Sequence, residues 1–322
     1  HMTNAQESEP GYYIDKWLHK TYPREYAELY RFLLQWGCKK IIIAPKYKDR
    51  EWFIPLEEAT GARVLDCRGK NNAINPDDYE EDILFTYTDD LYSFGKEQAL
   101  LRVTCGVKLA ARDLPTDHGF IVNNSETLYN LYRLLTEGRP VLTKFVHVYG
   151  ETPKHIFVET PIGTLATDLF EEAGMSIDEI EAKGYVIVDG GPGWFSVIED
   201  PRNYSVTKRT NSLLVIDPNY ADPKRNDVRN VGKWKGYPRE DGPAPEKAPS
   251  KLLEPQVVRV QLTDNPEFKI IKPSRPIVEV GQRVEVGDVI AEPAAEGFSI
   301  YHHASISGTV RAVTDRYIEI AR

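Results

Sequence analysis

Short apolar strands that alternate with helical segments dominate the first half of the chain. The run Lys40-Ile41-Ile42-Ile43-Ala44 is rich in β-branched residues and indicates a buried strand. Before it, Pro23 suits the first turn of a helix because proline has no N–H to leave unpaired. We expect further strands at 63–67 and 82–87, and a helix at 51–60. This alternation predicts an α/β layer with a mainly parallel sheet.

A different pattern begins near Pro140. Strands are expected at 144–149 and 155–159, joined by a turn that contains glycine and proline. Thr164 is expected to cap a helix through Ala173, because its hydroxyl can accept from the free N–H groups of a first turn. Another strand follows at 184–188. The order hairpin, helix, strand is typical of a β-grasp domain.

The last third of the chain divides into two parts. From 218 to 255 the apolar periodicity disappears and Pro, Lys, Asp and Gly dominate, which predicts a linker or an extended arm without core contacts. Short strands with glycine turns fill 278–320, as in the small barrel sandwiches that carry lipoyl or biotinyl groups. Those carriers modify a lysine at a hairpin tip, and the stretch between Ile290 and Ser305 contains no lysine. A docking or structural role is therefore the favoured interpretation.

The overall charge and the cysteines exclude several classes of function. The 40 basic and 49 acidic residues give a net charge of -9, which argues against nucleic-acid binding because that relies on clustered Lys and Arg. The three cysteines, Cys38, Cys67 and Cys105, form no C-x-x-C pair and fit a reducing compartment. An iron–sulphur cluster normally takes four thiolates, so we expect no cluster in this chain. The candidate ligands His147, His155, His302 and His303 are of a kind that more often lies on a surface or a strand face, so we expect no metal site.

The chain also contains no recognisable membrane or export signal. No apolar stretch approaches the roughly 20 residues that span a bilayer. No charged segment followed by an apolar segment marks a signal peptide, and His1-Met2 resembles a cloning remnant before a start methionine. We therefore expect a cytoplasmic protein without a membrane span.

Three polar segments are candidate binding sites. Residues 4–11 place amides and carboxylates before a Pro-Gly turn, although an acidic, disordered tail explains the same composition. In 92–101 a glycine turn opens a helix, whose free N–H groups favour anions, although a solvated helix start is the simpler interpretation. In 119–128 two asparagines follow an apolar strand, and Asn124 or Ser125 can equally act as a helix cap.

The order of these segments resembles one known family. Residues 4–11 look like the N-A-D-E-S-E-P-G segment that lines FMN in the flavin subunit of respiratory NADH dehydrogenase. Residues 92–101 are similar to its Y-x-x-G-E-E-x-A-L helix start, and 122–127 to its N-N-x-E-T motif. Residues 189–193 and 205–211 resemble the glycine-rich and V-T-K-T-T segments of the related RnfC/PduS-like family.

The carboxyl-terminal part extends the resemblance. Residues 303–310 are similar to the V-H-A-S-V-S-G-x-V segment of the RnfC/PduS-like barrel, which here follows the β-grasp (SLBB) domain as in PduS. The resemblance implies a Rossmann-like, FMN-binding-type α/β domain at 3–139 and a β-grasp domain at 140–217. A Pro-rich linker at 218–255 and a lipoyl-like barrel-sandwich hybrid domain at 256–322 complete the predicted fold.

The resemblance also implies a set of residues around the flavin. No catalytic residue is assigned, because the isoalloxazine ring of FMN carries the redox chemistry and the protein orients it. The residues carried over from the motifs are Asn4, Gln6, Glu9, Tyr92, Lys96, Glu97, Asn123, Asn124 and Thr127.

Several features depart from the family pattern. A glycine-rich loop that cradles the FMN phosphate would precede Asn4, and a partner chain is one possible source of it. Gln6 stands where the family has aspartate, and Lys96 where it has glutamate. A cation near the flavin should stabilise its reduced, anionic state, while the loss of carboxylates weakens a site for NADH hydroxyls. The cysteine clusters of PduS have no counterpart between the β-grasp and barrel domains.

These observations favour one function over two alternatives. The favoured function is an FMN-dependent electron-transfer subunit that passes electrons from a nicotinamide or other donor to a partner protein of a redox complex. The first alternative is a scaffold or adaptor that keeps the fold without the cofactor. The second is a corrinoid-reductase-associated ligand-binding protein, an analogy at the level of the fold alone.

Overall fold

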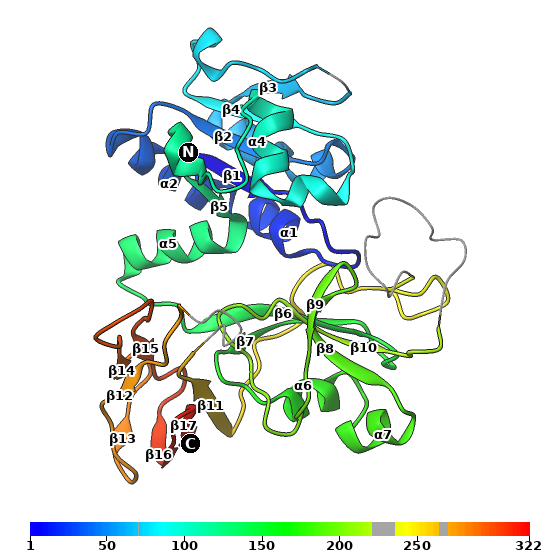
Figure 1. Ribbon diagram of the computed structural model, residues 1–322, viewed down its shortest axis with the longest axis vertical. Helices are drawn as coiled ribbons and strands as arrows, with labels where there is room; N and C mark the ends of the chain where they lie inside the picture. Colours follow the sequence, from blue (N-terminus) through cyan, green and yellow to red (C-terminus); the bar gives the residue numbers. More distant parts are fainter. Residues whose placement is uncertain (70, 221–235, 264–269) are drawn as a thin grey trace. The chain divides into compact units, whose positions relative to one another are not determined.

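A computed structural model of the protein describes residues 1–69, 71–220, 236–263 and 270–322. Within these residues the chain forms two compact units, the first covering 1–136 and the second beginning at Glu137. Both units are drawn in Figure 1, with the first in blue to green and the second in green to red.

The first unit is built on a parallel five-stranded sheet in the order β3-β4-β2-β1-β5. Its strands are β1 Met2–Ala5, β2 Ile41–Pro45, β3 Arg63–Asp66, β4 Ile83–Tyr87 and β5 Val122–Asn124. Its α-helices are α1 Ile14–Thr21, α2 Pro23–Gln35, α3 Ile54–Thr60, α4 Glu97–Cys105 and α5 Ser125–Glu137. Short 3-10 helices join them: η1 Tyr47–Trp52, η2 Pro76–Asp78, η3 Tyr92–Gly95 and η4 Pro115–His118. The predicted α/β layer with a parallel sheet is confirmed.

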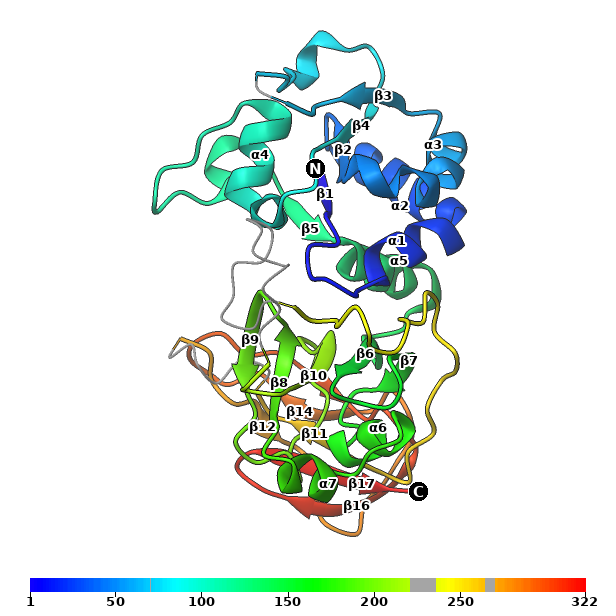
Figure 2. The same cartoon turned by 90° about the vertical axis from the view of Figure 1, so that its right-hand side faces the viewer.

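Helices cover both faces of this sheet (Figure 2). Met2, Ile42 and Ala44 face one side, where they pack in one apolar cluster with Leu100 and Leu101 of α4. On the opposite side α1, α2 and α3 contact one another, and the hydroxyls of Thr3 and Tyr30 lie 3.0 Å apart. Alternate residues of a strand point to opposite faces, so β1 contributes to both layers.

The amino-terminal segment is part of the core of this unit. β1 lies between β2 and β5, and Asn4 is aligned with Ala44 on one side and with Asn124 on the other. The alternative of a disordered tail is therefore wrong. The sequence pattern did not indicate a strand in this polar segment, because the strand is stable only through pairing with its two neighbours. The helix expected at 51–60 begins later, at Ile54, where Pro55 occupies its first turn.

The second unit begins with the β-grasp domain. Its five-stranded sheet has the order β7-β6-β10-β8-β9, with β6 and β10 parallel and the other pairs antiparallel. The strands are β6 Thr143–Gly150, β7 Ile156–Pro161, β8 Val186–Gly191, β9 Trp194–Val197 and β10 Ser212–Ile216. Two helices, α6 Ala166–Glu172 and α7 Ile177–Ala182, pack on one face of the sheet and share its apolar core.

The predicted cap of α6 is wrong. The residue before the helix is Leu165, and no side chain caps it. The hydroxyl of Thr164 instead donates to the carbonyl of Pro161 at 2.8 Å and lies 2.7 Å from the hydroxyl of Thr160. The Thr164 hydroxyl therefore bonds to the turn before the helix, and this local hydrogen bond competes with helix capping.

The barrel follows in the same unit. One sheet has the order β11-β17-β16-β13 and the other the order β12-β14-β15. Their strands are β11 Val257–Gln261, β12 Arg275–Pro276, β13 Arg283–Val284, β14 Val289–Glu292, β15 His302–His303, β16 Gly308–Val313 and β17 Tyr317–Ala321. Alternating residues of both sheets fill one core, including Val258, Val260, Ile318 and Ile320. This is the expected barrel sandwich.

The part of 218–255 that the structure describes runs along the edge of the β-grasp sheet. The Ser250 N–H donates to the carbonyl of Phe157 at 2.9 Å, and the Leu253 N–H donates to that of Glu159 at 2.9 Å. Tyr237 is fully buried, and Leu253 belongs to the β-grasp core. These contacts correct the expectation of an arm without core contacts. They also cover the edge of β7, which would otherwise present unpaired backbone groups.

The β-grasp domain and the barrel share a tight junction. Ile162 belongs to the barrel core, and its carbonyl accepts a hydrogen bond from the hydroxyl of Ser305. Gly163 has φ +92°, and a Cβ there would lie 2.9 Å from the backbone carbon of Arg259. The Arg259 N–H donates to the Gly163 carbonyl at 2.8 Å. Only glycine allows both this conformation and this approach of the two backbones.

Gly163→Ala should therefore destabilise the second unit through strain and through the clash with Arg259. Gly281→Ala is a matched control, because Gly281 has φ +89° and open space around a Cβ. We expect Gly163→Ala to cost about 2 kcal/mol more than Gly281→Ala, a difference that reports overpacking alone. Urea denaturation of both variants measures it, and equal losses would show that the junction is not tightly packed.

Candidate functional site

The carboxyl ends of the parallel strands bring the predicted site segments to one edge of the first unit. The chain leaves β1 for helices on one face of the sheet and leaves β4 for α4 on the other. In open parallel sheets ligands bind in the crevice outside the carboxyl ends, where connections diverge in this way. Residues 4–11, 92–97 and 123–127 all lie at this edge, which is therefore the candidate site.

Asn4 joins the end of β1 to the segment that follows β4. Its side-chain amide donates to the carbonyl of Gly95 at 2.8 Å. A Cβ on Gly95 would lie 2.4 Å from the hydroxyl oxygen of Ser8, so any larger residue there would have to displace that side chain. The Ser8 hydroxyl in turn donates to the carbonyl of Gln6 at 2.8 Å. These contacts hold two of the predicted segments together.

A second link joins the same two segments. The phenol of Tyr92 donates a hydrogen bond to the carboxylate of Glu9. Tyr92 is buried, and burial together with the Glu9 charge raises the pKa of the phenol well above its usual range. Tyr92 therefore stays protonated and keeps Glu9 in place as a fixed negative charge.

Gln6 is engaged within the protein. It is buried, and its amide donates to the carbonyl of Ala44 at 2.8 Å and to the hydroxyl of Thr88 at 3.0 Å. It thereby ties β1 to the ends of β2 and β4. Its predicted contact with a cofactor stays a prediction.

The third segment lies at the junction of β5 and α5. The side-chain oxygen of Asn124 accepts from the Thr127 N–H at 2.8 Å and so caps the helix, as one interpretation of the sequence predicted. Asn123 Oδ1 lies 3.0 Å from Nε2 of His1. The hydroxyl of Ser125 is buried and has no hydrogen-bond partner among the described residues. Such an orphaned polar atom beside a helix start is a potential ligand contact.

Lys96 and Glu97 open α4 on the exposed side of this edge. Lys96 is the residue before the helix, and its side chain, like that of Glu97, is exposed. A ligand can therefore reach both charges, together with the N–H groups of the first turn.

The sequence pattern did not single out Glu7, a buried carboxylate in the first polar segment, residues 4–11. Glu7 Oε2 accepts from the backbone N–H groups of Asp15 at 2.8 Å and Lys16 at 3.4 Å, and so caps α1. Burial, with a further contribution from Asp15, raises the pKa of Glu7 to about 8. Lys16 pairs with Asp49 at 3.5 Å beside it. The sequence feature that could have indicated Glu7 is its position next to Gln6 in the polar segment after β1.

A buried lysine at the same edge was also missed. Lys46 directly follows β2, and its ammonium lies 2.9 Å from Asp90, which follows β4. Asp90 also pairs with Lys48 at 2.9 Å. Burial lowers the pKa of Lys46, whereas for Asp90 the effect of burial is outweighed by Lys48 and Lys46, which hold the pKa of the carboxyl well below its usual range. This ion-pair network fixes the ends of β2 and β4.

The donor chemistry at this edge fits the expected FMN. Asparagine amides, the orphaned Ser125 hydroxyl and the exposed Lys96 can meet the hydroxyls, imide and phosphate of such a cofactor. In the described parts of the chain, no group of three or more His, Cys, Asp or Glu is placed to hold a metal ion. None of the helices there is long and apolar enough to cross a membrane.

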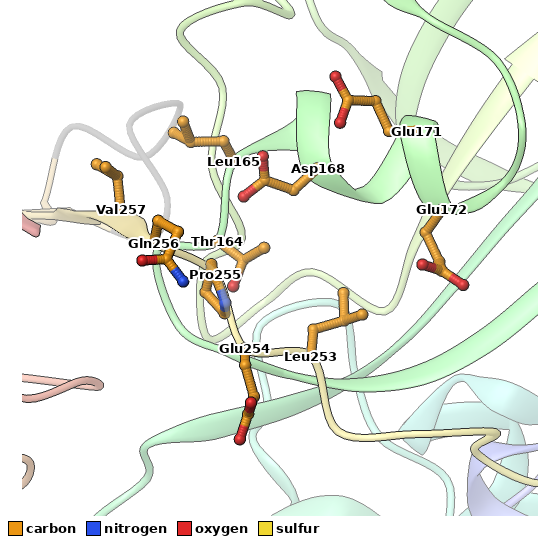
Figure 3. A pocket seen from close by; sticks show the side chains of 10 residues that line it. All are labelled: Thr164, Leu165, Asp168, Glu171, Glu172, Leu253, Glu254, Pro255, Gln256 and Val257. Carbon is orange, nitrogen blue, oxygen red and sulfur yellow. The ribbon is translucent and has the colours of Figure 1, made fainter. Parts of the chain in front are cut away.

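A hollow in the second unit is lined by acidic residues and does not suit an anionic cofactor. It has a volume of about 500 Å³ and lies beside α6 (Figure 3). In Figure 3 the Asp168 side chain points from α6 toward Gln256. Glu171, Glu172 and Glu254 also line the hollow, and burial and the Glu171 charge raise the pKa of Asp168. A phosphate group would be repelled there.

The raised pKa of Glu7 has a measurable consequence. A carboxyl whose pKa rises on folding stabilises the protein fully below its unfolded value of 4.5, and this contribution is lost as the pH rises through about 8. We therefore expect Glu7 to make stability fall between about pH 4.5 and about pH 8, and Glu7→Gln to reduce this fall.

Thermal unfolding of the parent protein and of Glu7→Gln across this range tests the effect. Glu58→Gln is the control, because Glu58 is an exposed carboxylate on α3 and its replacement should leave the pH profile of the parent unchanged. Parallel pH profiles for the parent and Glu7→Gln would contradict the assignment.

Comparison with known families agrees with this geometry. Residues 2–133 match the Nuo51 FMN-binding domain, and 255–322 match the RnfC barrel sandwich hybrid domain. A cobalamin reductase PduS from Salmonella typhimurium is 27% identical over 222 residues, which are 67% of this chain and 43% of the relative. An ion-translocating oxidoreductase complex subunit from Buchnera aphidicola is 24% identical over 218 residues, 67% of this chain and 38% of the relative.

Solved structures support the fold. An NAD+-reducing NiFe hydrogenase in the H2-reduced state superposes with a TM-score of 0.51 at 20% identity, covering 67% of this chain and 40% of that one. The chain spans less than half the length of the curated relatives it matches. The chain is thus similar to the RnfC and PduS proteins, with a match to the Nuo51 FMN-binding domain over residues 2–133 and to the RnfC barrel sandwich hybrid domain over residues 255–322.

Proposed function

We propose that the first unit binds FMN at the carboxyl edge of its sheet and that the chain is an electron-transfer subunit of an oxidoreductase complex. The observation that carries the proposal is the meeting of three separate polar segments at this edge, two of them joined by the Asn4–Gly95 and Tyr92–Glu9 hydrogen bonds. When bound, FMN would supply the redox chemistry, and the protein would supply orientation and electrostatics.

The residues divide into those that shape the site and those that meet the ligand. Gln6 and Glu7 are buried and satisfied within the protein, so they hold the loop after β1 in place. Asn4 uses its amide nitrogen on Gly95, and its side-chain oxygen can act as an acceptor for the ligand. Lys96 and Thr127 are exposed, so a ligand at this edge can reach their side chains.

The proposal also concerns the electron donor and the electron acceptor of this subunit. We expect no iron–sulphur cluster in this chain, so an electron would pass from the flavin directly to a docked protein. The donor would be a nicotinamide or another reductant, and another subunit could supply further contacts to the flavin phosphate. The cytoplasmic location stays a prediction.

Titration of the purified chain with FMN, alone and with its partner subunits, tests the proposal. We expect saturable quenching of flavin fluorescence in at least one of these two conditions. Asn4→Ala should weaken binding about tenfold, since it removes both a ligand acceptor and the link to Gly95. Asn130→Ala, on α5 away from the capping turn, should bind FMN like the parent protein.

Absence of quenching under both conditions would overturn the proposal and favour a scaffold that has lost the cofactor. Equal weakening by Asn4→Ala and Asn130→Ala would show that the amide edge around β1 is not the binding site.

Lys96 provides a test of the electrostatics. A cation beside the flavin favours its more negative, reduced state, so Lys96→Glu should make the midpoint potential of bound FMN more negative. Lys108→Glu, an equal change of charge on an exposed residue beyond α4, should shift it much less. Redox titration followed by flavin absorbance measures both, and equal shifts would remove Lys96 from the vicinity of the ring.

A further inference from the structure

Two sequence segments that the flavin site does not use meet in the second unit. Asp189 lies in the glycine-rich segment at the end of β8, and Arg209 lies in the 205–211 segment before β10. Asp189 accepts from the phenol of Tyr204 and from the hydroxyl of Thr210, the latter at 3.3 Å. The guanidinium of Arg209 lies 3.7 Å from the same carboxylate oxygen.

This polar network lines a cavity between the β-grasp sheet and the barrel. The cavity has a volume of about 640 Å³, in the range typical of small-molecule sites. The β-grasp side contributes Glu199, Asp200 and Arg209, and the barrel side contributes Arg316 and Tyr317. The two domains belong to one compact unit and are joined by the close backbone contact at Gly163.

Within this cavity, some charges are satisfied by the protein and others are not. Asp189 is almost fully buried and anchors Arg209, whose guanidinium also reaches the Ser196 hydroxyl at 3.4 Å. Asp200 accepts from the side-chain amide of Asn203 at 2.8 Å. Across the residues that the structure describes, no hydrogen bond or ion pair engages the side chains of Glu199 and Arg316, although both line the cavity.

Glu199 and Arg316 are exposed, so water solvates them when the cavity is empty, and a ligand that carries both charges can replace this water with direct contacts. An ammonium group satisfies a carboxylate such as Glu199, and a carboxylate forms paired hydrogen bonds with the fork of an arginine such as Arg316. The tyrosine rings of Tyr204 and Tyr317 add apolar wall to the cavity. We propose that this cavity binds a small zwitterion, an α-amino acid or short peptide, with its ammonium toward Glu199 and its carboxylate toward Arg316.

The test uses the full chain and ligands that differ in one charge at a time. Amino acids and glycyl dipeptides are screened by thermal shift at about 10 mM, and any that stabilise the protein are measured by calorimetry. The N-acetyl form of each ligand keeps only the negative charge, and its amide keeps only the positive charge. We expect a zwitterion to bind with a dissociation constant below about 1 mM and both single-charge forms to bind about tenfold weaker.

Two variants test which residue binds which charged group of the ligand. In Arg316→Gln the zwitterion should bind no better than its amide, and in Glu199→Gln no better than its N-acetyl form. Arg311→Gln and Glu279→Gln are controls, because both residues are exposed on the barrel outside the cavity and should leave binding unchanged. Circular dichroism establishes that all four variants are folded.

The proposal is overturned if no zwitterion stabilises the protein, if an N-acetyl form binds as tightly as its parent, or if Arg316→Gln and Glu199→Gln both bind like the controls. FMN binding is measured separately in the first unit, so loss of one activity leaves the other interpretable.

Discussion

The position of β1 inside the parallel sheet is the constraint on which the candidate site depends. Backbone pairing to β2 on one side and to β5 on the other places Asn4 beside Asn124. Because β1 ends at Ala5, the polar residues that follow must emerge at the carboxyl edge, where β4 and β5 also end. Met2 and Thr3 anchor the strand by facing opposite helix layers. Without this pairing the segment would be an acidic tail with no site.

The second unit depends on a different constraint, the close approach of two backbones at Gly163. Ile162 belongs to the barrel core while the strand before it belongs to the β-grasp sheet, so the barrel core includes a residue that directly follows a β-grasp strand. The described part of the arm adds to this by covering the edge of β7 and by burying Tyr237. The cavity between the two domains is lined by residues of both.

Local sequence patterns predicted the helices and strands whose structure depends mainly on their own residues. The β-branched run at Ile41 is a strand, and the helix that begins at Pro23 is where its proline indicates. The pattern did not reveal β1, because a polar four-residue strand is stable only through its neighbours. The Thr164 hydroxyl and the buried Leu253 were misjudged for a related reason, since each is decided by a contact outside its own element. At the site, motif order predicted the three segments, whereas the buried Glu7 and Lys46 needed the structure.

FMN binding at the edge around β1 is tested most directly by the side-chain amide resonances of its asparagines. Asparagine-labelled protein is observed by NMR while FMN is added, with partner subunits present if binding requires them. We predict that the Asn4, Asn123 and Asn124 amides shift, while that of Asn219, in the second unit, does not. FMN binding that shifts only resonances of the second unit, or that leaves these three amides unchanged, would contradict a flavin site at this edge.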